Sequence, residues 1–204
     1  MKIALLYAVL SACCLAAGLS GCAGVSADVQ ASPTAAQFQG ERSYVVARSP
    51  LQDGRSDYPE YDTLVRRELG KYGFADAAGQ RAHYLLSIAY DTRPAAIGVA
   101  TETCTEQGQG CSSPGGQSFS LFGRRSYKHS LTLRFFEQAN GREVYKVSAS
   151  SQDHDADPLH AIPYLVKSTL AQLPFTGHAD WRVKLSPGNT GGVPQVVSVK
   201  PVQP

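Results

Sequence analysis

The 204-residue sequence lacks an apolar run long enough to cross a membrane as a helix. Its leading apolar stretch extends from about Ile3 to Ala17, whereas a membrane-spanning helix needs about 20 apolar residues. A basic residue at Lys2 and the small pair Ser20–Gly21 complete the layout of an export signal. Residues 1–21 are therefore predicted to be a signal peptide, and the alternative of a retained anchor helix fits poorly.

The sequence also lacks an excess of charge of either sign. The formal net charge is +2, so that no strong field attracts nucleic acid. Basic residues are scattered, and the two nearest approaches to a cluster, Arg66–Arg67 and Arg124–Arg125, are interpreted as solvated faces or loops. We therefore predict no nucleic-acid partner.

Motifs for catalytic nucleophiles and for nucleotide binding are missing. The sequence has no Gly-x-Ser-x-Gly elbow. The glycine-rich stretch 108–116 (GQGCSSPGG) lacks the lysine and the strand-to-helix setting that a phosphate-binding loop needs. These absences predict a protein that is not an enzyme and that uses no cofactor.

The leader ends on a cysteine, in the stretch Leu19–Val25 (LSGCAGV). Leu19, Ser20, Gly21 and Cys22 resemble the lipobox of bacterial lipoproteins, in which an apolar residue and two small residues precede an invariant thiol. A thiolate is the nucleophile that can form a thioether to a diacylglyceryl group, and two or three acyl chains anchor a protein stably. We predict that Cys22 is lipidated and binds membrane lipid. The alternative is an ordinary secreted protein whose cleavage site precedes a cysteine.

Composition divides the rest of the chain into three parts. Residues 22–40 are rich in Ala, Ser, Gln and Gly and are predicted to form a lipidated flexible tether. Residues 41–185 suffice for one periplasmic domain, and the Pro/Gly-rich residues 186–204 are predicted to be a disordered tail. In lipoprotein sorting, a non-acidic residue such as Ala23 after the lipidated cysteine favours the outer membrane. The predicted location is therefore the outer membrane, lipid-anchored and facing the periplasm.

Few cysteines remain for the domain. Of five in the sequence, Cys13 and Cys14 lie in the leader and Cys22 carries lipid, which leaves Cys104 and Cys111. An even remainder in an oxidising compartment predicts one disulfide, which would stabilise the loop by about 2 to 3 kcal/mol. Free thiols or a redox role are the alternatives. These two cysteines are not expected to form a zinc site, since zinc usually takes four ligands in close pairs.

Hydrophobic periodicity predicts strands and two helices in the domain. Helices are expected from Asp57 to Gly73 and over 161–173, the second starting near His160 rather than at Asp157 because Pro163 belongs in a first turn. Strands are expected at 43–49, 82–94, 129–137, 142–151 and, as a short last candidate, 181–185. Asn140–Gly141 predicts a tight hairpin turn between the third and fourth strands.

These elements predict an α+β fold. We expect an antiparallel or mixed sheet of about four strands, with two helices on one face. A long disulfide-bearing loop, residues 93–128, is expected to interrupt it, with a hairpin excursion of the flanking strands.

One stretch, 153–160 (DHDADPLH), concentrates imidazoles and carboxylates. Such residues can coordinate a divalent metal or form an acid–base pair, and the metal-ligand candidates are His154, Asp157 and His160. The position of the stretch between a strand and a helix favours a capping turn instead, and no metal is predicted. The isolated His83, His129 and His178 are interpreted as surface or internally satisfied histidines.

The sequence from Arg42 to Phe175 resembles the domain of unknown function 4136 family of bacterial lipoproteins. The resemblance rests on an early strand with Tyr44, and on the motifs LGKYGF (69–74), YLLSIAYD (84–91), GREVYKVSAS (141–150) and LPF (173–175). The cysteine-bearing loop and the C-terminal tail depart from the family pattern. The resemblance implies a fold and a lipoprotein, but no established activity.

The sequence therefore predicts an outer-membrane lipoprotein whose domain binds an envelope protein partner or stabilises an assembly without catalysis. One alternative is a metal-dependent hydrolase that uses His154, His160 and nearby aspartates. Another is a small-ligand carrier with an aromatic-lined groove, although the tyrosines are first expected to pack in the core. The tyrosines concerned are Tyr61, Tyr72, Tyr84, Tyr90 and Tyr145.

Overall fold

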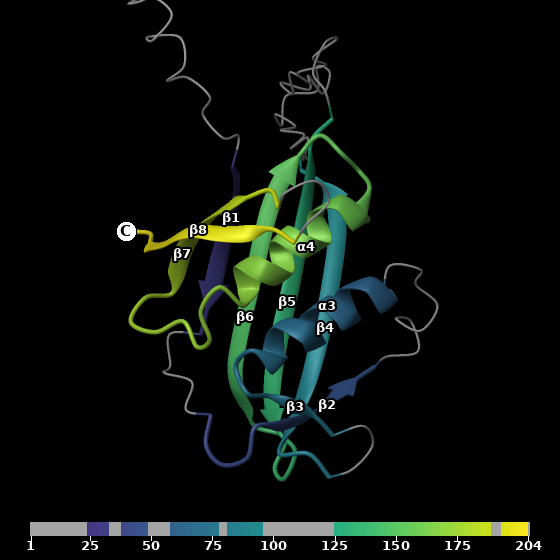
Figure 1. Ribbon diagram of the computed structural model, residues 1–204, viewed down its shortest axis with the longest axis vertical. Helices are drawn as coiled ribbons and strands as arrows, with labels where there is room; N and C mark the ends of the chain where they lie inside the picture. Colours follow the sequence, from purple (N-terminus) through teal and green to yellow (C-terminus); the bar gives the residue numbers. More distant parts are fainter. Residues whose placement is uncertain are drawn as a thin grey trace, which may run out of the picture.

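The computed structural model describes residues 24–32, 38–48, 58–77, 81–95, 125–188 and 193–203. These residues form one eight-stranded mixed sheet with the strand order β3-β2-β4-β5-β6-β1-β7-β8, together with two helices (Figure 1). The strands are β1 Val25–Ala31, β2 Ser43–Ala47, β3 Ala75–Asp76, β4 Tyr84–Pro94, β5 Tyr127–Glu137, β6 Glu143–Asp153, β7 Asp180–Ser186 and β8 Gln195–Pro201. The helices are α3 Tyr58–Gly70 and α4 Pro158–Thr169.

The centre of the sheet is an antiparallel meander of the three long strands β4, β5 and β6. Strands β4 and β5 pair from Tyr84 opposite Glu137 to Pro94 opposite Tyr127, which confirms the hairpin excursion expected at the ends of loop 93–128. The predicted hairpin between β5 and β6 is confirmed, but its turn spans the four residues 138–141 between the bonded pair Glu137 and Arg142, with Gly141 at φ +70°. Strand β2 extends the sheet in parallel with β4.

Both helices lie in front of the sheet in Figure 1 and pack against each other, and α4 contacts β1, β5 and β6. Side chains that alternate along the strands point toward the helices and are fully buried, such as Leu131, Leu133 and Phe135 on β5. The core lies between the helices and this face. The alternate side chains of the central strands form a second, polar face on the other side of the sheet.

The expected sheet of about four strands is wrong, because segments predicted to lie outside the domain join it. Residues 25–31, assigned above to the tether over 22–40, form β1 between β6 and β7. Ala27 and Val29 are buried there against the helix side. Alanine contributes little to a hydrophobic pattern, so that the alternation of small buried residues with Ser, Asp and Gln does not stand out in the sequence.

The predicted disordered tail over 186–204 is also wrong for residues 195–201. They form β8, which pairs antiparallel with β7 and ends the sheet. Most of its side chains are exposed, so that β8 carries no core pattern, and Pro201 is acceptable on an edge strand. The short strand expected at 181–185 is confirmed as part of β7.

The helices are close to their predicted positions, but the expected start of the second near His160 is wrong. The helix α4 begins at Pro158, with Asp157 as its N-cap, and Pro163 lies inside it. The side-chain oxygen of Asp157 accepts a hydrogen bond from the Leu159 amide, 3.0 Å away, and a proline is tolerated at the first helical position. Capping at Asp157 therefore outweighs the hydrogen bond that Pro163 cannot donate.

The residues of the lipid anchor and the predicted disulfide, Cys22, Cys104 and Cys111, lie outside the described residues, and those two predictions remain untested by the fold. The middle of the long loop, residues 96–124, lies outside them as well. Within the described part of the chain, no helix combines the length and the hydropathy needed to cross a membrane.

Candidate functional site

Two histidines and an aspartate meet at the end of the sheet where β5 begins, β6 ends and α4 begins. The residues are His129, Asp153 and His160, and one nitrogen or oxygen from each lies within 4.8 Å of the other two. They come from three different elements, so that the fold of the whole sheet positions them. We call them the histidine–aspartate cluster.

His129 is the buried member of the cluster, with 0% of its surface exposed. Its Nε2 atom lies 3.0 Å from the carbonyl oxygen of Asp155 and 3.4 Å from Oδ1 of Asp153. On the other side of the ring, Nδ1 lies 3.0 Å from the hydroxyl of Thr92 and 3.2 Å from that of Tyr90. The ring therefore has polar partners at both nitrogens although it lies in the core.

His160 lies in the first turn of α4 and is about one third exposed. Its Nε2 atom lies 2.8 Å from Oδ2 of Asp153, and its Nδ1–H donates to the carbonyl oxygen of Asp157. Burial by itself lowers the pKa of His160, but the hydrogen bonds to Asp153 and Asp157 outweigh it and hold the pKa above its ordinary value. Burial likewise raises the pKa of Asp153, but the hydrogen bonds from His160 and the Asp155 amide outweigh it and lower the pKa.

The aspartates of the stretch 153–160 form a series of turns that leads into α4. An oxygen of Asp153 accepts from the amide of Asp155 and one of Asp155 accepts from the amide of Asp157, each at 2.9 Å. The last step is the cap of Asp157 on Leu159. Each side chain thus accepts the N–H two residues later. The prediction of a helix-entry turn is confirmed.

Of the metal-ligand candidates named from the sequence, the structure brings only His160 into the cluster. Asp157 caps α4, and Nδ1 of His154 lies 3.1 Å from the carbonyl oxygen of Arg125. The interpretation of His129 as an internally satisfied histidine is confirmed by its partners at both nitrogens, but it did not include the contact with Asp153. A signal was present, since His129 continues the inward alternation of Leu131, and strand pairing then places it near the end of β6.

A shallow depression of about 730 Å³ opens beside the cluster. It leads from solvent to Asp153 and His160, while His129 stays beneath them. The depression is lined by Arg125, Tyr127, Asp153, His154, Asp155, Ala156 and His160.

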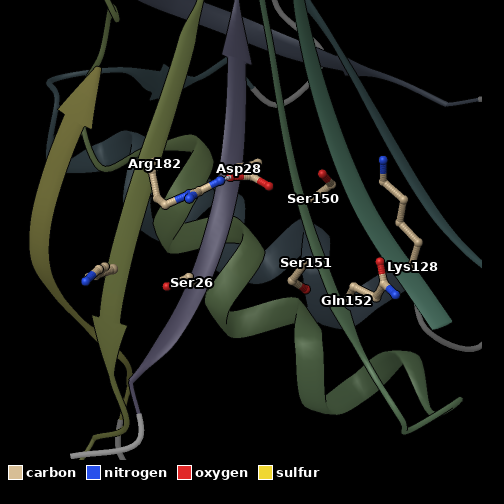
Figure 2. Close-up of a pocket in the computed structure, with 8 residues that line it drawn as sticks. Ser26, Asp28, Lys128, Ser150, Ser151, Gln152 and Arg182 are labelled. Atoms are coloured by element: carbon tan, nitrogen blue, oxygen red, sulfur yellow. Dashed lines mark hydrogen bonds and ion pairs between the residues drawn. The ribbon is translucent and has the colours of Figure 1, made fainter. Parts of the chain in front are cut away.

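A second candidate site lies on the polar face of the sheet. In Figure 2, α4 lies behind the strands, and the labelled side chains stand on the face away from it. A hollow of about 540 Å³ is lined there by Ser26, Asp28, Lys128, Ser150, Ser151, Gln152, Arg182 and Lys184. We call it the serine–lysine hollow, because small serines lie between longer charged side chains.

The charges of the serine–lysine hollow are only partly neutralised. Nη2 of Arg182 lies 2.9 Å from Oδ1 of Asp28, and both side chains are more than half exposed. Among the described residues, neither Lys128 nor Lys184 forms an ion pair. The hollow therefore presents two positive charges to solvent.

The tyrosines pack in the core, as predicted, rather than lining a groove. Tyr61, Tyr84, Tyr90 and Tyr145 are buried, and Tyr72 packs against the core from its edge. Two of the hydroxyls donate to backbone carbonyl oxygens, that of Tyr84 to Gln39 at 2.6 Å and that of Tyr72 to Leu170 at 2.6 Å. This packing does not favour the carrier with an aromatic-lined groove.

No protein-family model matches the chain, and no curated protein matches it. The resemblance to the domain of unknown function 4136 family therefore remains a prediction. Several solved structures are similar to the chain at 14% to 16% sequence identity.

A PDZ domain protein from Parabacteroides distasonis matches with a TM-score of 0.50 and 14% identity, over 80% of this chain and 40% of that one. The chain thus spans less than half of that protein. Two PelC dodecamer structures from Paraburkholderia phytofirmans match at TM-scores of 0.41 and 0.43, with 16% and 14% identity, over 71% of this chain and 95% of theirs. A Caulobacter crescentus protein provisionally named a lipoprotein matches at a TM-score of 0.24 and 16% identity, over 64% of this chain and 77% of that one. At 14% identity and a TM-score of 0.50, the similarity to the PDZ domain protein concerns the fold alone.

Proposed function

We propose that this chain is a lipoprotein of the bacterial outer membrane, anchored through acylated Cys22, whose periplasmic domain binds another envelope component without catalysis. The observation that carries the proposal is the lipobox-like stretch Leu19–Cys22 at the end of an export signal. Acylation at this cysteine would hold the domain at a bilayer surface. The non-acidic Ala23 supports the outer membrane.

The position of β1 supports a short connection to the membrane. Strand β1 begins at Val25, three residues after Cys22. Because each residue spans at most about 3.6 Å, the sheet starts within about 11 Å of the acylated residue. Asp28 pairs with Ser150, so that the start of β1 lies at the same end of the sheet as Asp153. We infer that this end of the domain lies next to the bilayer.

The serine–lysine hollow is the surface that we assign to the partner. The helices leave this face of the sheet uncovered, and the exposed Lys184 and the half-buried Lys128 favour a partner that presents acidic or polar groups there. Among the described residues, the hollow contains no histidine to act as a general base. These features favour binding over catalysis.

Acyl labelling tests the anchor. In cells fed a labelled fatty acid, the wild-type chain should incorporate the label, and Cys22→Ala should abolish incorporation. The variant Cys104→Ser controls for loss of a thiol as such and should keep the label. A mature wild-type chain whose mass shows an unmodified amino terminus would refute the anchor.

Site-specific crosslinking tests the binding surface. A photoreactive residue at Ser150 should capture an envelope component in intact cells, and the same residue at Arg67, which is about half exposed on α3, should not. The double variant Lys128→Glu, Lys184→Glu should abolish capture from Ser150, whereas Arg67→Glu should preserve it. Equal capture from the two faces, or capture that is insensitive to the charge reversal, would contradict the assignment of this surface.

A further inference from the structure

We propose that the histidine–aspartate cluster binds a divalent transition-metal ion of the zinc class, with Nε2 of His129, a carboxylate oxygen of Asp153 and Nε2 of His160 as ligands. This proposal goes beyond the binding function above and does not depend on it. Two imidazoles and one carboxylate suit zinc and its neighbours among the transition metals. Calcium and magnesium prefer oxygen ligands alone.

The spacing of the ligand atoms fits one shared ion. Two atoms that each lie about 2.1 Å from the same ion are separated by about 3.0 to 3.4 Å in octahedral and tetrahedral geometry. In the cluster, Oδ1 of Asp153 lies 3.4 Å from Nε2 of His129, while the other oxygen, Oδ2, lies 2.8 Å from Nε2 of His160, and one ligand atom from each residue lies within 4.8 Å of the other two. Small movements of the partly exposed His160 and Asp153 side chains would therefore accommodate the ion.

The outer nitrogens of both rings are held in the manner typical of metal-binding histidines, which hydrogen-bond a second shell through the other nitrogen. Nδ1–H of His160 donates to the carbonyl oxygen of Asp157. The Tyr90 hydroxyl donates to the carbonyl oxygen of Pro158, so that its own oxygen can accept from Nδ1–H of His129. With Nδ1 protonated in each ring, and with the ion displacing the Nε2 proton that His160 donates to Asp153, both Nε2 lone pairs would face the cluster.

A further ligand and a route to solvent are present. The carbonyl oxygen of Asp155 lies 3.0 Å from Nε2 of His129, a separation that two ligands of one ion can have, and it is the candidate fourth protein ligand. The depression lined by Arg125, Tyr127 and His154 gives an ion access from solvent and leaves room for a water ligand. The buried ring of His129 gives the site one ligand whose position is fixed by the core.

A network of hydrogen bonds alone offers a competing explanation of the same contacts. In that case His129 carries its proton on Nε2 and donates it to the Asp155 carbonyl, and the Thr92 hydroxyl donates to Nδ1. The cluster would then only brace the entry to α4. The two explanations differ in whether the protein binds an ion at these atoms.

Titration of the purified full-length protein with Co²⁺, followed by competition with Zn²⁺, decides between them. We expect one ion per chain, visible absorption bands of Co²⁺ bound to nitrogen and oxygen, and no thiolate-to-cobalt charge-transfer band. His160→Ala should weaken binding by at least about 100-fold, as loss of a direct ligand exceeds the 10- to 100-fold effect of second-shell changes. The matched control His154→Ala, in the same turn but outside the cluster, should bind within about threefold of wild type.

Nuclear magnetic resonance of the wild-type protein tests the same site without any variant, so that the result does not depend on whether a variant folds. On addition of Zn²⁺, the imidazole signals of His129 and His160 should shift together at one equivalent, while those of His154 and His178 stay in place. The proposal is overturned if no ion binds, if a thiolate band marks binding at cysteines only, or if His154→Ala weakens binding as much as His160→Ala.

Discussion

The Nζ atom of Lys167 on α4 lies 2.8 Å from Oε2 of Glu68 on α3, and this ion pair joins the two helices across 99 positions of the chain. Lys71 approaches the same oxygen, also at 2.8 Å. The Glu68 side chain is only 5% exposed. One buried carboxylate therefore connects α3 to α4 on the helix side of the sheet.

Glu68→Gln should destabilise the protein, because Lys167 would lose the charge that compensates its partial burial. We expect a loss of about 2 kcal/mol in the free energy of unfolding at pH 7. Burial raises the pKa of Glu68, but the hydrogen bonds from Lys167 and Lys71 outweigh it and bring the pKa below 4.5. The depressed pKa means that the charged carboxylate stabilises the fold above pH 4.5 and that this contribution disappears as the pH falls through the folded-state pKa.

Urea unfolding at pH 7 and at pH 3 to 4 would measure this dependence on Glu68, with a smaller difference between wild type and variant at the lower pH. Glu143→Gln is the matched control, since Glu143 pairs with the half-exposed Arg134 on the surface and should cost less than about 0.5 kcal/mol. An equal difference at both pH values would contradict the role given to the charge.

Phe38→Ala should destabilise the protein by about 3 kcal/mol, because truncating a packed aromatic residue leaves a cavity. Phe38 belongs to the segment predicted to be a tether, yet its ring packs by its edges against four aromatic rings. Their centroid distances are 5.1 Å to Phe74, 5.6 Å to Tyr84, 5.2 Å to Phe135 and 5.5 Å to Tyr145. Thermal and urea unfolding would measure the loss. An unchanged stability would support the prediction that Phe38 belongs to a flexible tether.

Tyr145→Phe should cost about 1 to 2 kcal/mol, because the buried amide of Phe175 donates to the Tyr145 hydroxyl at 3.0 Å and would lose its acceptor. Burial raises the pKa of Tyr145 to about 12, so that the hydroxyl stays neutral over the usual working range. Tyr164→Phe is the control, because the Tyr164 hydroxyl has no hydrogen-bond partner among the described residues. Chemical denaturation at pH 7 compares them, and equal losses would argue against the Phe175 bond.

Val199→Asp should destabilise the protein by about 2 kcal/mol, because folding would remove the charged carboxylate from water and place it against the core. Val199 is partly buried on β8 and pairs with the fully buried Val183 of β7. Val197→Asp places the same charge two residues away at a position that is 65% exposed, where we expect a change below about 0.5 kcal/mol. If β8 did not form, both variants would unfold like wild type.

Much of the fold could be predicted because its signals are local. The alternation of Leu131, Leu133 and Phe135, and the Asn140–Gly141 turn, lie within one hairpin, whose strands need only a short loop to meet. The alternation along β5 also placed the His129 side chain on the buried face. The contact of that ring with His160, across a strand and a turn, could not be predicted from the alternation.

The sequence by itself determined the lipobox-like leader, the long central strands and helix α3, because each depends on residues that are neighbours along the chain. Tertiary structure alone decided that residues 25–31 lie between β6 and β7, that residues 195–201 complete the sheet, and that His129, Asp153 and His160 converge. The physical reason is that the free energy that stabilises these segments comes from contacts with distant parts of the chain. Strands with small or exposed side chains gain it from hydrogen bonds to distant strands, and those partners leave no pattern in the segment itself.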